Sequence, residues 1–124
     1  MLAGILSAGC AAHSVGALGP NSIRRADNGT GPLYKVVYDG RFAEARAYAA
    51  EAERGGLTVT ALEGDPTALW LYDLGPHWAA GGGAVAGVTT ARTLLCLEQM
   101  AHDVWRRVRA RDAYGELVCW TIDC

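Results

Sequence analysis

The sequence predicts an α/β fold with three layers, in which three helices cover a mostly parallel, four-stranded sheet. Strand-like and helix-like segments alternate from residue 33 onward, and segments of about 10 to 18 residues separate the strands. Connections of that length are crossovers, which join parallel strands. Right-handed crossovers that place helices on both faces favour the strand order 2-1-3-4.

Length and composition predict one domain and exclude some classes of partner. The chain has 124 residues, of which 51% are hydrophobic, enough to bury one core. Its 11 basic and 13 acidic side chains give a net charge of -2, so no strong positive field attracts nucleic acid. No apolar run reaches the roughly 20 residues that a membrane span needs. We therefore expect neither a nucleic-acid partner nor a membrane span, and the oligomeric state stays open.

The first βαβ unit is predicted from residues 33–64. Residues 33–39 (LYKVVYD) are rich in β-branched and aromatic side chains and form the first expected strand. Residues 41–54 follow with small and aromatic side chains at helical spacing, and two glycines end this helix. Residues 57–64 (LTVTALEG) form the second expected strand.

A second helix and a third strand are predicted from residues 65–88. Asp65 and Pro66 are typical of a helix start, because Asp accepts bonds from free N–H groups and Pro needs no N–H there. This helix is expected to stop near Gly75 and Pro76. Residues 81–88 (GGGAVAGV) then form a short apolar strand.

The last third of the chain predicts the longest helix and a final strand. Apolar residues from Leu94 to Val108 are spaced 3, 4, 3 and 4, which is typical of one buried stripe on a helix over residues 91–109. The basic run of residues 106–111 is then interpreted as complementing the helix dipole, with an acidic partner as the alternative. Residues 116–123 (ELVCWTID) form the fourth strand, parallel or as an antiparallel edge.

Residues 1–32 differ from the domain of residues 33–124. They contain a small, apolar stretch, MLAGILSAGCAAHSVGALGP, that resembles the core and cleavage region of a secretory signal without its basic start. The arginine pair Arg24 and Arg25 follows this stretch instead of preceding it. We expect a leader remnant and a periplasmic or secreted protein. Alternatively, the segment is a flexible N-terminus of a cytoplasmic protein.

Five residues are candidates for ligand binding, because ligands of open α/β sheets bind beyond the carboxyl ends of the strands. They are Asp39, Arg41, Asp65, Thr89 and Thr90. Free N–H groups at the helix start after Thr89 and Thr90 attract carboxylate or phosphate. The alternative is that these threonines only cap the helix.

Catalytic residues remain unknown from the sequence. Asp39 and Asp65 form a candidate acid/base pair or divalent-metal site, but the favoured interpretation is that Asp65 caps a helix and Asp39 ends a strand. His77 is a candidate base or a solvated loop residue. No nucleophile elbow, P-loop or metal-finger spacing is present, so we predict no cofactor and no metal. Cys96 is expected to be buried and inert, and any pairing among Cys96, Cys119 and Cys124 stays open.

Three segments carry a resemblance to a family: VVYDGRFAEAR, GDPTALW and AGVTTARTLLCLEQMA. Together they resemble short, uncharacterised bacterial exported proteins with twin-arginine-type leaders, over residues 33–100. The chain departs from that pattern because it lacks the double arginine before its apolar stretch. The resemblance implies export but no activity, so it assigns no catalytic residue.

The functional hypothesis is a small exported α/β domain that binds a small anionic ligand or a protein partner, without turnover. One alternative is an enzyme of the hydrolase or lyase kind that uses Asp39 and Asp65. A third reading is an accessory subunit of an exported complex, with an exposed apolar patch near Trp78 or the last strand.

Overall fold

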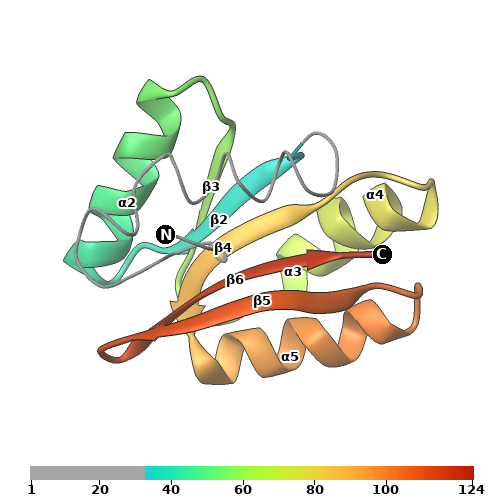
Figure 1. Ribbon diagram of the computed structural model, residues 1–124. Helices are drawn as coiled ribbons and strands as arrows, with labels where there is room; N and C mark the ends of the chain where they lie inside the picture. The colour runs from blue at the N-terminus through green and yellow to red at the C-terminus, as the bar shows by residue number, and fades with distance from the viewer. Residues whose placement is uncertain (1–32) are drawn as a thin grey trace.

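A computed structural model describes residues 33–124 and shows a mixed α/β fold around a five-stranded sheet (Figure 1). The strand order is β3-β2-β4-β6-β5. The expected leader remnant, residues 1–32, lies outside the described residues. In chain order the elements are β2 (Lys35–Asp39), α2 (Ala43–Arg54), β3 (Val59–Leu62), α3 (Thr67–Leu69), the π-helical turn η2 (Trp70–Leu74), α4 (Gly75–Ala79), β4 (Val85–Thr90), α5 (Ala91–His102), β5 (Arg107–Tyr114) and β6 (Leu117–Asp123).

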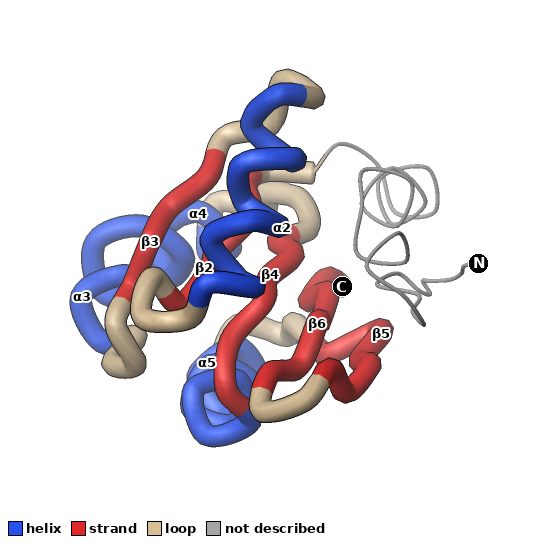
Figure 2. Tube along the Cα trace, turned by 90° about the vertical axis from the view of Figure 1, so that its left-hand side faces the viewer, coloured by secondary structure: helices blue, strands red, loops and turns tan. Residues whose placement is uncertain are grey.

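The half of the sheet formed by β3, β2 and β4, here called the parallel half, follows the expected βαβ pattern. β2 lies between β3 and β4 and is parallel to both. The helix α2 covers one face, while α5 and the helical segment of residues 67–79 cover the other (Figure 2). Successive side chains of a strand point to opposite faces, so Val36 packs in the core under α2 and Val37 in the core under α5.

The prediction of four mostly parallel strands was wrong, because the expected helix over residues 91–109 ends at His102. The chain turns and forms β5, which is antiparallel to β6, and β6 is antiparallel to β4. The four expected strands do lie in the order 2-1-3-4, with β5 added at the edge. Val108 contacts the same core as predicted, but from a strand. The basic run therefore lies mostly on an edge strand and not at a helix end.

The second helix was also predicted too short, because the helical segment continues through Gly75 and Pro76 to Ala79. A π-helical turn precedes the proline. Such a turn changes the hydrogen-bond ladder where Pro76 supplies no N–H. A Cβ at Gly75 would lie 2.9 Å from the Trp70 carbonyl oxygen, so the turn has no room for a side chain there.

Trp78, on this helical segment, packs in the hydrophobic core. Its side chain is buried, and its indole Nε1 donates to the Gly83 carbonyl at 2.9 Å. The patch suggested around Trp78 by the sequence is therefore not exposed. Among residues 33–124, no helix combines the length and apolarity needed to cross a bilayer.

Candidate functional site

The carboxyl ends of β2, β3 and β4 border an open hollow of about 430 Å³, here called the rim pocket. Of the five candidate residues, Arg41, Asp65 and Thr90 line it. The other two do not line it: Asp39 is bound to Arg41, and Thr89 is buried. The full lining is Arg41, Glu63, Gly64, Asp65, Thr90, Arg92 and Thr93.

Asp39 holds Arg41 in place at one wall of the rim pocket. Its carboxylate is fully buried and accepts from Arg41 Nε at 2.9 Å, from Arg41 Nη2 at 2.7 Å and from the Arg41 backbone N–H at 3.0 Å. These hydrogen bonds lower the pKa of Asp39, against the opposing effect of burial. Asp39 is thus an ionised positioning group, while the side chain of Arg41 remains half exposed.

Gly64 provides the surface on which the Arg41 guanidinium lies. Its φ is +94°, a conformation that favours glycine. A Cβ at this position would also lie 2.9 Å from Arg41 Nη2. Any side chain at position 64 would therefore strain the backbone and displace the guanidinium.

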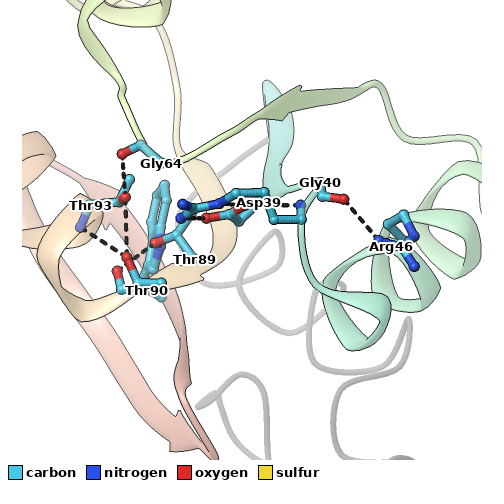
Figure 3. Close-up of polar contacts among 9 residues, drawn as sticks. Asp39, Gly40, Arg46, Gly64, Thr89, Thr90 and Thr93 are labelled. Atoms are coloured by element: carbon cyan, nitrogen blue, oxygen red, sulfur yellow. Dashed lines mark hydrogen bonds and ion pairs between the residues drawn. The ribbon is translucent and has the colours of Figure 1, made fainter.

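Thr90 and Thr93 also line the rim pocket and link two segments of the chain (Figure 3). Thr90 Oγ1 accepts from the backbone N–H of Thr93 at 3.3 Å, which caps α5. Thr93 Oγ1 in turn donates to the Gly64 carbonyl at 2.6 Å. The start of α5 is thereby tied to the loop that follows β3.

Thr89 has a structural role. Its Oγ1 accepts from Trp120 Nε1 at 3.0 Å and donates to the Thr90 carbonyl at 3.0 Å, and the residue is fully buried. The hydroxyl therefore satisfies a buried indole and does not face the rim pocket.

The candidate catalytic residues do not form one constellation. Asp65 accepts from the Thr67 hydroxyl at 2.6 Å and from the Thr67 N–H at 2.9 Å, and these bonds lower its pKa. Asp39 is bound separately by Arg41. His77 stacks on Tyr34, just before β2, with ring centroids 3.5 Å apart, at the opposite end of the strand from Asp39.

Arg92 is the functional candidate that sequence reasoning missed. It is exposed in the first turn of α5 and has no ion-pair partner among the described residues. A cation is disfavoured at a helix N-terminus, and this first turn contains no acidic residue. An arginine in that unfavourable place was the signal that the sequence offered.

A second hollow, of about 380 Å³, lies between the start of α2 and the β5–β6 turn. Glu44 and Glu116 line it together with Phe42, Tyr114, Gly115 and Leu117. Two carboxylates and no basic side chain make this hollow unsuited to an anion.

The three cysteines of residues 33–124 are all free. Cys96 is exposed on α5, so the expectation of a buried thiol was wrong: it falls outside the stripe formed by Leu94 and Leu97. Cys119 is buried, and burial raises the pKa of its thiol. Within this part of the chain, no three His, Cys, Asp or Glu side chains gather as metal ligands would.

Comparison with known proteins adds no family to this description. No protein-family model, curated protein or solved structure matches the chain. The geometry of the rim pocket is therefore the basis for a functional proposal, and the resemblance to exported proteins stays a prediction.

Proposed function

We propose that the protein binds a small anion, a carboxylate or a phosphate, in the rim pocket and does not turn it over. The observation that carries this proposal is the presence of two guanidinium groups, Arg41 and Arg92, on one hollow at the start of a capped helix. Backbone N–H groups at a helix start and arginine side chains are both donors that favour anions.

Arg41 is suited to this role because it is already oriented. Asp39 engages its Nε and Nη2, and no hydrogen bond within residues 33–124 engages its Nη1. In the first turn of α5, Thr90 accepts the N–H of Thr93, while the N–H groups of Ala91 and Arg92 precede any partner inside the helix. The ligand would take these remaining donors.

The acidic side chains of the rim pocket limit the size and charge of the ligand. Glu63 and Asp65 lie on the same hollow as the two arginines. A polyanion would meet these carboxylates, whereas a single carboxylate or phosphate group fits between the arginines and the start of α5. We therefore propose a compact ligand with one anionic group.

Titration with inorganic phosphate and with acetate, followed by amide NMR shifts, tests the proposal. We expect saturable shifts at Gly64, Arg92 and Thr93. Arg92→Ala should weaken binding at least fivefold, since it removes a charged donor without removing a core contact. The control is Arg54→Ala, an exposed arginine paired with Glu51 at the far end of α2, which should leave binding unchanged.

Two results would contradict this function. One is the absence of shifts around the rim pocket at ligand concentrations of tens of millimolar. The other is equal weakening by Arg92→Ala and Arg54→Ala, which would indicate general charge screening. An acid/base enzyme built on Asp39 and Asp65 finds no support, because each carboxylate is held by its own neighbour in the sequence.

We also propose that the protein is exported, on the basis of the apolar stretch in residues 1–32. Fractionation of cells expressing the chain from its own start tests this. Recovery from the periplasm or medium is expected, and recovery from the cytoplasm alone would contradict it.

A further inference from the structure

Trp105 occupies a backbone conformation that few large residues adopt. Its φ is +63°, and it is the one non-glycine residue of the described part with a positive φ. The Trp105 N–H donates to the His102 carbonyl at 3.1 Å, and the Arg106 N–H donates to the Ala101 carbonyl at 2.9 Å. This pattern is the left-handed cap that ends a helix, where glycine is the usual residue. Tryptophan at this position strains the backbone.

Packing does not compensate this strain. Trp105 is 82% exposed, which makes it the most exposed of the four tryptophans. A strained backbone that holds a large aromatic ring in solvent contributes nothing to stability. Such outliers concentrate at functional surfaces.

The strand β5 begins two residues after Trp105 and lies at the edge of the sheet. It pairs with β6 on one side and with no other strand of residues 33–124 (Figure 1). Arg107, Arg109 and Arg111 on this strand are exposed. Arg109 donates to the Cys124 carbonyl and Arg111 pairs with Glu98, so Arg107 is the one of the three whose side chain has no hydrogen-bond or ion-pair partner among residues 33–124. An edge strand presents free backbone N–H and C=O groups, to which another extended segment can bind.

We propose that Trp105, Arg107 and the free edge of β5, here called the β5 edge surface, dock an acidic, extended segment of a partner protein. The backbone of the segment would pair with β5, a carboxylate would face Arg107, and an apolar side chain would cover Trp105. Charge complementarity favours this occupant over a second copy of the chain, which would bring one arginine-rich strand against another.

Edge protection alone does not account for these features. Charged side chains and the irregularity between Val108 and Ala110 are devices that keep sheet edges from pairing with other copies. Protection of the edge explains the arginines, but an exposed indole favours association at an edge and does not prevent it. Trp105 is therefore the residue that favours partner docking over edge protection as the role of this surface.

Binding of a labelled peptide to the full chain, followed by fluorescence anisotropy, tests the proposal. The probe alternates glutamate with valine over eight residues and ends in leucine; the control peptide carries glutamine in place of glutamate. We expect binding of the acidic peptide at low salt and at least tenfold weaker binding of the control. Trp105→Gly should weaken binding at least fivefold without lowering the melting temperature, because glycine relaxes the helix cap.

Matched variants distinguish this surface from the rim pocket. Arg107→Gln should weaken peptide binding, while Arg92→Ala should leave it unchanged. Equal binding of both peptides, or unchanged binding by a folded Trp105→Gly variant, would overturn the proposal. It would also be overturned if a single-stranded oligonucleotide bound in place of the peptide, or if the chain paired with itself through β5.

Discussion

The parallel half of the sheet and the antiparallel half, formed by β6 and β5, differ in how their strands are covered. The strands β2 and β4 are buried along nearly their whole length. The strand β5 alternates between exposed and half-buried positions, as expected for an edge. Both halves contribute to the core, since β6 is buried as well. The parallel half also borders the rim pocket, whereas the antiparallel half ends in β5, a strand with one unpaired edge among the described residues.

The two halves meet where β4 pairs with β6, at Gly87 opposite Trp120. A Cβ at Gly87 would overlap the six-membered ring of Trp120. We expect Gly87→Ala to lower the free energy of unfolding by about 3 kcal/mol, measured by urea denaturation, because the indole has to leave its site. The control is Gly40→Ala, whose Cβ would lie at an ordinary 3.7 Å from its nearest neighbour. Equal stability of the two variants would contradict a tight junction.

In the parallel half, the two aspartates should differ in their contribution to stability. Asp39→Asn should lower the free energy of unfolding by about 2 kcal/mol, because a buried carboxylate loses its charged hydrogen bonds. Asp65→Asn should change it little, since asparagine caps a helix start as well as aspartate does. Urea denaturation of both variants at pH 7 measures the difference, and similar losses would contradict the assigned roles.

The lowered pKa of Asp39 also predicts a dependence on pH. Its stabilising effect is present above the unfolded-state pKa of about 4 and is lost as the pH falls through the lower folded-state pKa. The free energy of unfolding of the wild type should thus fall between pH 4 and pH 2 more steeply than that of Asp39→Asn. Parallel curves would show that Asp39 does not carry this effect.

In the antiparallel half, one substitution should stabilise the protein. Trp105→Gly removes the penalty of a left-handed conformation and should raise the free energy of unfolding by up to about 1 kcal/mol. Trp105→Ala is the matched control, since it removes the same indole but keeps the Cβ that causes the strain. Thermal and urea denaturation measure both variants. A gain with alanine equal to that with glycine would mean that the exposed ring, and not the backbone, is the cause.

The smallest effect is expected at the surface of the antiparallel half. Arg111 pairs with Glu98 at 3.1 Å, but more than half of the arginine side chain is exposed. Exposed ion pairs contribute little, so a double-mutant cycle with Arg111→Ala and Glu98→Ala should give a coupling of about 0.5 kcal/mol or less. In the parallel half, the ion pair of Lys35 and Asp73 is less exposed. The corresponding cycle should give a larger coupling. A smaller coupling for Lys35 and Asp73 than for Arg111 and Glu98 would contradict this expectation.

The parallel half could be predicted from the sequence because local signals and tertiary packing agree there. The strand β2 is a run of β-branched and aromatic residues, and the glycines after α2 end that helix where expected. The strand β6 was also predicted, but β5 was missed because Trp105 stands where a glycine would have marked the end of α5. Without that signal, Val104 and Val108 continued the helical spacing into a segment whose period is that of a strand.

The candidate site could be predicted in its location but not in its detail. The rule that ligands bind at strand carboxyl ends identified Arg41 and Thr90. It also selected Thr89, whose hydroxyl binds Trp120, a partner that only the antiparallel pairing of β4 and β6 brings near. The contributions of Gly64 and Thr93 depend on a contact between residues 29 positions apart, which no local pattern encodes.

The bond between Thr93 and the Gly64 carbonyl has a consequence for the kinetics of the protein. This bond joins two walls of the rim pocket, so association of the proposed anion should need no slow ordering of a loop. An anion should then exchange rapidly, with an affinity controlled by its dissociation rate. Removing the Thr93 hydroxyl would add conformational freedom to the empty protein, and the cost of ordering these walls would fall on the ligand.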